Sequence, residues 1–402
     1  MKKLVIILLG IYTVCFSVSC RKKETDDCPN CPKVDELKPA SGKKGDTIVI
    51  IGRNFSEVLN ENIVMFNGTI VPASLMISGN ATKLKVLVPP KCGTGSVEVK
   101  RDDELYSENG PIFTYKPETV VSVFAGSSTG TSGNTATGVT LANTRFNAPT
   151  QVAVDPSNNI YVLDAGNTKI VKLDVTTGQS KVLSDGSSQV SNPTALAVDE
   201  NSIVYVSSYE PTGMKSTIFK YTPGSSFPTF YCNDFEAGRK HVSLSPEGSG
   251  KFYIGRVTTN LSIVLPDITY YTPANGHKDF TCFFGNVIYY KNGTVYQLNS
   301  IVAMKIYQTE FSKYNVKDTV ETVLIDNLGG LNMSLGLVVD DGGNAYISDT
   351  ENNRILKYSS SGAVTTLIST GLNKPQGIAM DKLGNIYVAD TGNNCIKKII
   401  FD

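Results

Sequence analysis

The sequence has very little of the residue types on which many catalytic sites depend. Tryptophan is absent from the 402 residues, and only 2 histidines occur, His241 and His277. Two histidines are too few for a histidine-rich metal centre, and we expect both at the surface or in loops. Lysine plus arginine and aspartate plus glutamate number 37 each, so the formal net charge is +0. Because the chain has no excess of positive charge, it lacks the positive electrostatic potential that attracts polyanions, which argues against nucleic-acid binding.

A phosphate-binding glycine loop is also missing from the sequence. We therefore assign no catalytic residue, no metal ligand and no cofactor. Glycine is abundant instead, with 35 residues, many of them beside asparagine or aspartate, which is typical of tight turns between short strands. A chain of 402 residues is too long for one ordinary hydrophobic core, so two domains are expected.

The amino end predicts export and lipid attachment. The apolar run Leu4–Phe16 is shorter than the roughly 20 residues of a membrane span, so residues 1–19 are interpreted as a signal peptide. The sequence Ser-Val-Ser-Cys at 17–20 resembles the bacterial lipobox, which implies lipidation of Cys20. The polar residues 20–32 are expected to form a flexible tether. Arg21 after the cysteine resembles lipoproteins of the outer membrane, and the acidic residues of the tether resemble surface-export signals. We therefore predict a lipid-anchored protein that faces the cell exterior.

A C-x-x-C pair, Cys28 and Cys31, lies in this tether. No second pair of cysteines or histidines accompanies it as a zinc site requires, and no thioredoxin-like setting surrounds it. We interpret it as a disulfide formed in an oxidising compartment.

Residues 33–116 predict a small β-sandwich. Strand-length apolar runs bounded by Gly, Pro or Asn-Gly occupy 45–55, 64–68, 84–89, 95–99 and 112–115. Partly alternating runs of this kind predict antiparallel sheets joined by turns. Their order, ending in an aromatic strand, resembles the IPT/TIG immunoglobulin-like family, which implies a spacer or binding role without catalytic residues. Phe55 and Phe66 are expected in its core.

Four later segments share one pattern of two strands around a tight turn. They begin at Pro149, Pro193, Ser334 and Pro375. In each, an aspartate precedes a tyrosine by the same interval, in the pairs Asp155/Tyr161, Asp199/Tyr205, Asp340/Tyr346 and Asp381/Tyr387. A repeat of short strands with a period of roughly forty residues indicates propeller blades. Because the aspartates recur at equivalent turns, we interpret them as turn caps rather than calcium ligands or a catalytic carboxylate pair.

The segments that follow these pairs resemble the NHL repeat. They are 164–167, 349–354 and 390–394, and the residues that follow their last asparagine, where the family has histidine, are Thr168, Arg354 and Cys395. Weaker copies at 240–265 and 280–298 bring the count to six. Residues 120–125 suit the outer strand that the last blade lacks, and that strand would close the ring. The predicted fold is all-β, with the sandwich followed by a six-bladed β-propeller over 117–402.

The predicted location on the cell surface and the order of the two domains together predict a binding protein. A tethered sandwich followed by a propeller resembles cell-surface lipoproteins encoded with glycan-uptake systems, which implies a polysaccharide ligand or an outer-membrane transporter complex as partner. Contact with the membrane would be through the lipid anchor only. Function often resides where a repeat loses its regularity. The candidate ligand-binding residues in the irregular blades are Tyr209, Tyr270, Tyr271, Tyr289 and Tyr290.

Three other interpretations stay open from the sequence. The tyrosines also fit half-buried strand positions between blades. NHL-type propellers are commonly protein-interaction scaffolds, so the ligand can be a protein. The architecture also resembles metal-dependent lactonases and esterases of the gluconolactonase type, which hold a metal with acidic and amide side chains at the central channel, although fold alone does not imply activity.

Overall fold

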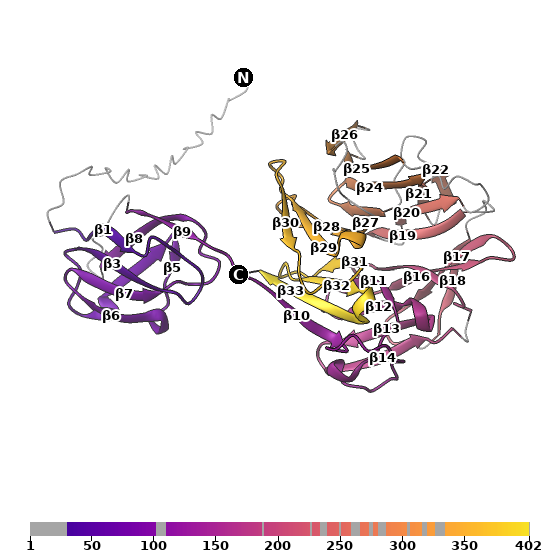
Figure 1. The fold of residues 1–402 in the computed structure, drawn as a ribbon, viewed down its shortest axis with the longest axis horizontal. Helices are drawn as coiled ribbons and strands as arrows, with labels where there is room; N and C mark the ends of the chain where they lie inside the picture. The colour runs from indigo at the N-terminus through magenta and orange to yellow at the C-terminus, as the bar shows by residue number, and fades with distance from the viewer. Residues whose placement is uncertain are drawn as a thin grey trace, which may run out of the picture. The chain divides into compact units, whose positions relative to one another are not determined.

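The structure is a computed structural model, and it describes twelve ranges of the chain. They are 30–101, 110–186, 189–225, 227–233, 239–248, 251–258, 266–272, 276–279, 287–303, 306–315, 320–325 and 334–401. The chain separates into two compact units, of which the first ends at Glu118 and the second is Thr119–Phe401. Figure 1 traces the strands of each unit in chain order.

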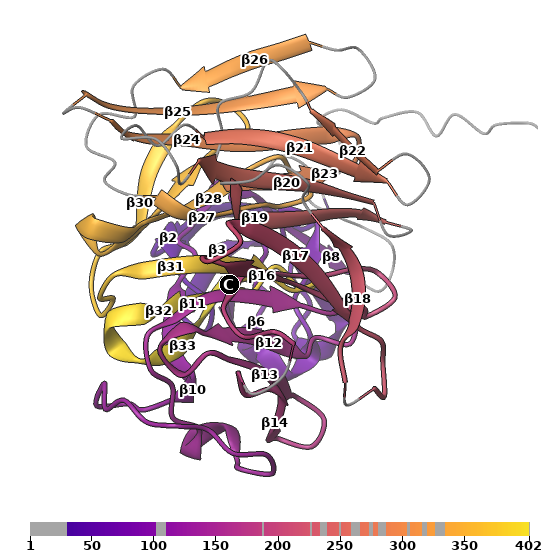
Figure 2. The same cartoon turned by 90° about the vertical axis from the view of Figure 1, so that its right-hand side faces the viewer.

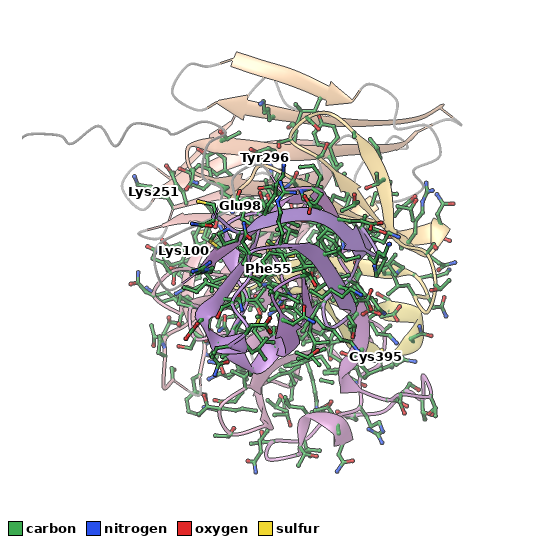
Figure 3. All side chains as sticks on the ribbon, turned by 90° about the vertical axis from the view of Figure 1, so that its left-hand side faces the viewer. Phe55, Glu98, Lys100, Lys251, Tyr296 and Cys395 are labelled. Atoms are coloured by element: carbon green, nitrogen blue, oxygen red, sulfur yellow. The ribbon has the colours of Figure 1, made fainter. Side chains whose placement is uncertain are left out.

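The first unit consists of two β-sheets around one hydrophobic core. One sheet has the strand order β1-β3-β7-β6 and the other β2-β9-β8-β4-β5. The strands are β1 (Lys33–Lys38), β2 (Ser41–Gly42), β3 (Thr47–Arg53), β4 (Asn62–Phe66), β5 (Thr69–Ile70), β6 (Met76–Asn80), β7 (Lys83–Leu87), β8 (Gly95–Arg101) and β9 (Ile112–Tyr115). Phe66 packs edge-on against Phe113 with ring centroids 5.0 Å apart. Phe55, labelled in Figure 3, and Phe66 are both buried in this core, as predicted.

The second unit consists of four-stranded antiparallel sheets, six of them in the described residues. The first three are β11 (Pro149–Val154), β12 (Ile160–Asp164), β13 (Lys169–Asp174) and β14 (Gln179–Ser184); β15 (Pro193–Val198), β16 (Val204–Glu210), β17 (Lys215–Tyr221) and β18 (Thr229–Asn233); and β19 (Arg239–Gly248), β20 (Lys251–Thr258), β21 (Pro266–Thr272) and β22 (Gly276–Asp279). The others are β23 (Val287–Lys291), β24 (Thr294–Ala303), β25 (Ile306–Asn315) and β26 (Val320–Ile325); β27 (Ser334–Val339), β28 (Ala345–Asp349), β29 (Arg354–Tyr358) and β30 (Val364–Ile368); and β31 (Pro375–Met380), β32 (Ile386–Asp390), β33 (Cys395–Phe401) and β10 (Thr119–Gly126).

The helical segments in the described part of the chain are short 3-10 turns. They are η1 (Leu59–Glu61), η2 (Ala73–Leu75), η3 (Leu141–Asn143), η4 (Ala165–Asn167), η5 (Thr350–Asn352) and η6 (Thr391–Asn393). The all-β prediction is therefore confirmed.

The sheets of the second unit form a closed, propeller-like ring. Their innermost strands are β11, β15, β19, β23, β27 and β31, and each contacts the innermost strand of the next sheet. Contacts between β31 and β11 close the circle. On the outside, β10 pairs with β33, so that Val120 lies opposite Ile400 and Val121 opposite Ile399. Figure 1 shows these two strands side by side, and Figure 2 shows the sheets after a quarter turn. The prediction that residues 120–125 supply the missing outer strand is confirmed.

Glycine is required where the ring closes. A Cβ added to Gly377 on β31 would lie 2.6 Å from the Cα of Gln151 on β11. Backbone atoms cannot move aside cheaply, so only a residue without a side chain lets these two strands approach so closely. Gly336 on β27 is restricted in the same way, because its Cβ would lie 2.4 Å from the carbonyl oxygen of Gln376.

The constant interval between aspartate and tyrosine has a direct structural cause. Asp381 Oδ1 accepts hydrogen bonds from the backbone N–H of Leu383 and of Asn385, both at 2.9 Å. Its Oδ2 accepts bonds from Asn385 Nδ2 at 2.8 Å and from the Tyr387 hydroxyl at 3.3 Å. The same tyrosine hydroxyl bond recurs at Asp155, Asp199 and Asp340. The aspartates cap their turns, as predicted, and thereby hold the first two strands of each sheet together.

The NHL-like segments join neighbouring sheets. Thr391 Oγ1 donates a hydrogen bond to the Pro149 carbonyl at 2.7 Å, and Asn394 Oδ1 accepts one from the Ala148 N–H at 2.8 Å. These bonds connect the last sheet to the first. Equivalent bonds, both 2.7 Å, run from Thr350 to Pro375 and from Lys374 to Asn353. The polar residues of these segments therefore have a structural role, because they connect neighbouring sheets of the ring, and we assign them no catalytic role.

Candidate ligand-binding site

The innermost strands surround a channel that holds a cavity of about 240 Å³. All six of these strands line it. Each is hydrogen-bonded to a neighbour on one side only, because it lies at the end of its sheet. Its other edge therefore turns backbone N–H and C=O groups toward the channel. The polar groups available to a molecule in this cavity are largely those of the main chain.

Gln151 lies at the end of the channel where the innermost strands begin. Its Nε2 donates hydrogen bonds to the carbonyls of Val242, at 2.8 Å, and Thr194, at 3.3 Å. Its Oε1 accepts a bond from the Leu196 N–H at 2.7 Å. One side chain thus connects β11 to β15 and to β19 and satisfies three of the edge groups. We refer to this side of the cavity as the Gln151 end.

Tyr289 on β23 lies toward the opposite end of the channel. It also lines a second cavity of about 480 Å³, and Met380 is likewise shared by the two cavities. The second cavity is formed mainly by the turns that follow the innermost strands. Its remaining residues are Lys291, Val339, Asp340, Asp341, Asp381, Lys382, Leu383 and Gly384. We refer to this side as the Tyr289 end.

The Tyr289 end combines exposed apolar surface with charges of both signs. The Leu383 side chain is 71% exposed. Lys291 Nζ forms an ion pair of 2.8 Å with Asp341 and donates a hydrogen bond of 3.0 Å to the Val339 carbonyl. The Asp341 side chain is 97% exposed, so water screens this pair strongly and either partner can turn to a ligand. Lys382 adds a further cation.

Two of the candidate tyrosines contribute to this region. Burial, with a smaller effect from the Asp341 charge, raises the pKa of Tyr289 to about 12, so its hydroxyl is a neutral donor at physiological pH. Tyr290 stacks on the buried Tyr253 with ring centroids 5.3 Å apart, and its backbone N–H donates to Ser245 Oγ at 2.7 Å. These contacts fix the position of Tyr290 in the channel wall beside Tyr289.

The other candidate tyrosines are not brought into this site. Tyr209 is buried near the end of β16, where its backbone exchanges hydrogen bonds with Asn192. The backbones of Tyr270 and Tyr271 lie in β21, the third strand from the channel, opposite Tyr253 and Phe252. Their side chains lie outside what the structure describes.

The expectation that His241 lies at the surface is wrong. Its side chain is fully buried, and its Nδ1 lies 2.9 Å from Ser207 Oγ on β16, the neighbouring sheet. Its backbone N–H donates to the buried Ser216 at 3.2 Å. A polar contact sealed between two sheets has no access to a substrate, so we assign it no chemistry. His277 and the lipidation residue Cys20 lie outside the side chains that the structure describes.

Cysteines give no further candidate in the described chain. Cys31 is disulfide-bonded, and its partner lies outside the described residues, as does Cys28. Burial raises the pKa of the Cys395 thiol to about 12, which keeps it protonated and unreactive.

The channel lining does not supply the ligands of a lactonase-type metal site. The described residues that line the 240 Å³ cavity include no aspartate, glutamate or histidine. Nor do the described side chains contain a group of three His, Cys, Asp or Glu residues arranged to hold a metal ion. The acidic donors that the lactonase interpretation needs are thus missing from this lining.

Sequence reasoning missed several residues of the site. Gln151 occupies a strand position that holds Ala195, Gly336 or Gly377 in other repeats, so a large polar residue there was a usable signal. Leu383 is an apolar residue at the tip of a polar turn, which is a second such signal.

The described chain contains no helix with the length and apolar character that a membrane crossing requires.

Comparison with known families agrees with this architecture. Residues 32–115 match the IPT/TIG domain, and residues 331–358 and 372–399 match the NHL repeat. No curated protein matches the chain.

Solved structures extend the similarity to nearly the whole chain. An auxiliary nutrient binding protein from Bacteroides ovatus ATCC 8483 is 18% identical with a TM-score of 0.56, over 92% of this chain and 98% of that one. Another from Bacteroides thetaiotaomicron VPI-5482 is 16% identical with a TM-score of 0.53, over 92% and 98%. A streptogramin B lyase is 11% identical with a TM-score of 0.50, over 71% and 98%. Identities this low establish the fold alone. The chain carries an IPT/TIG domain followed by a propeller-like unit that contains NHL repeats.

Proposed function

We propose that this protein binds an extracellular nutrient, and that the nutrient is a glycan. The observation that carries the proposal is the pair of cavities that meet at Tyr289. One cavity offers main-chain donors and acceptors, and the other offers Leu383 beside Lys382 and Asp341. A sugar presents hydroxyl groups around its edge and apolar C–H groups on its faces, so it can use both kinds of surface.

The size of the two cavities supports a ligand of more than one sugar. Binding sites for small molecules commonly enclose about 300–1,000 Å³. The channel cavity of about 240 Å³ is below that range, whereas the two cavities together lie within it. The structural neighbours described as auxiliary nutrient binding proteins support the same role at the level of architecture.

The location that we propose follows from the amino end. Lipidation of Cys20 would hold the protein on the outer membrane, facing the cell exterior, with residues 20–32 as the tether. A polysaccharide, or a complex with an outer-membrane transporter, would then be its partner. Mass spectrometry of the mature protein tests the anchor, because a mature terminus without acyl chains at Cys20 contradicts it.

Calorimetry against starch, xylan, galactomannan, pectin and levan tests the function. We expect at least one of them to bind and the Leu383→Ser variant to weaken that binding about tenfold, the effect of roughly 1.4 kcal/mol of lost apolar contact. Phe227→Ser is the matched control, because Phe227 is similarly exposed, at 78%, but does not line either cavity. Binding to none of the five glycans, or an equal loss in both variants, contradicts the proposal.

A further inference from the structure

We propose that the site recognises the end of a glycan chain, with one terminal sugar inside the channel and the next units in the cavity at the Tyr289 end. This inference rests on the proposed function and specifies which part of a polymer is bound.

The Gln151 end of the channel is obstructed. The Gln151 side chain spans from β11 to β15 and β19 and is held by three hydrogen bonds of 2.7 to 3.3 Å. On the other side, β31 approaches β11 so closely that a Cβ on Gly377 would lie 2.6 Å from the Gln151 Cα. Gly336 shows that β27 and β31 are equally close. In the part of the chain that the structure describes, this side chain and the closely packed strands narrow the channel at this end.

The Tyr289 end gives access from the outside. Tyr289 and Met380 line both cavities, so the channel continues into the larger one. That cavity is bordered by turns, which lie at the surface, and Leu383 in one of them is largely exposed. A ligand therefore enters past Tyr289 and stops before Gln151.

The volume of the channel limits what can enter. Its cavity of about 240 Å³ lies below the roughly 300–1,000 Å³ of ordinary small-molecule sites, so it suits a ligand of about one sugar ring. An internal sugar of a polymer continues in both directions and cannot occupy a recess with a single opening. Only a terminal sugar can do so.

The channel wall offers this terminal sugar fixed polar partners. Edge groups of the innermost strands belong to strands that are held by their own sheets, so they are preorganised. Gln151 and Ser245 already satisfy some of these groups, at Leu196 and Tyr290 for example. The remaining edge groups can exchange water for hydroxyl groups of the sugar.

Counting protein molecules bound per gram of glycan tests the inference. The five glycans of the panel are compared intact and after partial acid hydrolysis, with the number of chain ends measured in each sample. End recognition predicts that the capacity per gram rises in proportion to the number of ends. Recognition of internal segments predicts a capacity that is unchanged or falls, and that result overturns the inference while leaving the proposed function intact. Absence of binding to all ten samples overturns both.

The Gln151→Ala variant tests the role of the obstruction. We expect its affinity for the hydrolysate to fall severalfold. The side chain that narrows the inner end of the channel is removed, and the Leu196 N–H loses its hydrogen-bond acceptor. Gln376→Ala is the matched control, since Gln376 is on β31, beside Gly377, and its side chain lines neither cavity. Equal affinities in the two variants contradict the role of Gln151. If Gln151→Ala does not fold, the count of chain ends still decides the question.

Discussion

Two adjacent aspartates, Asp340 and Asp341, should respond very differently to replacement by alanine. Asp340 Oδ1 accepts a hydrogen bond from the Asn344 N–H at 2.8 Å, and its Oδ2 accepts bonds from Asn344 Nδ2 at 2.8 Å and the Tyr346 hydroxyl at 3.1 Å. In the described part of the chain, the contact that Asp341 makes is the exposed ion pair with Lys291. The two variants therefore remove the same chemical group from neighbouring positions, one inside the turn and one outside it.

The expected magnitude follows from these contacts. A net hydrogen bond contributes about 0.5–1.5 kcal/mol, and a buried hydroxyl left without a partner costs about 1–3 kcal/mol. Tyr346 is only 5% exposed, so its hydroxyl would lose its partner in Asp340→Ala. Allowing for overlap between these contributions, we expect a loss of about 3 kcal/mol. For a domain of this size that lowers the melting temperature by roughly 5 °C. Asp341→Ala should leave the melting temperature nearly unchanged, because solvent screens its pair.

Differential scanning calorimetry of the full chain measures both variants. The relevant transition is that of the second unit, which contains both residues. The test is whether Asp340→Ala lowers the melting temperature of this transition more than Asp341→Ala does. If Asp341→Ala lowers the transition as much as Asp340→Ala does, the interpretation of the repeated aspartates as turn caps is wrong.

Three further predictions concern the ring and its buried charges. Gly377→Val should separate β31 from β11 and lower the melting transition of the second unit by several degrees, whereas an unchanged transition would refute the close approach at Gln151. Deletion of residues 119–126 should leave β33 as an open edge and produce aggregation in light scattering, and a monodisperse protein would argue against the closing role of β10. Burial raises the pKa of Asp164 to about 6, so the folded protein binds this proton more tightly than the unfolded chain, in which the pKa of an aspartate is 3.8. Stability relative to Asp164→Asn should therefore increase by about 1 kcal/mol as the pH falls from about 7 to 5, and denaturation curves that shift in the opposite direction would contradict this sign.

Much of the fold was predictable because its causes are local. The interval between Asp381 and Tyr387 is fixed by a hydrogen bond across one turn, so it can be read directly from the sequence. The outer strand at residues 120–125 was predictable because the last repeat ends one strand short, and an unpaired edge requires a partner.

The positions of individual side chains depend on contacts between sheets, which the sequence does not display. His241 is buried because Ser207, on a different sheet, lies against it. Tyr209 was chosen as a candidate because it lies in an irregular repeat. Its backbone forms hydrogen bonds with Asn192, which hold it away from the channel. The site at Tyr289 likewise depends on turns from three sheets, and no single segment of the sequence reveals their proximity.

A crystal structure of the protein grown with the hydrolysed glycan that binds it tests the central claim most directly. We predict density for one sugar in the channel beside Tyr289, with further sugars extending over Leu383 toward the solvent. Density confined to the first unit or to the surface around Phe227, with the channel holding only water, would contradict the account.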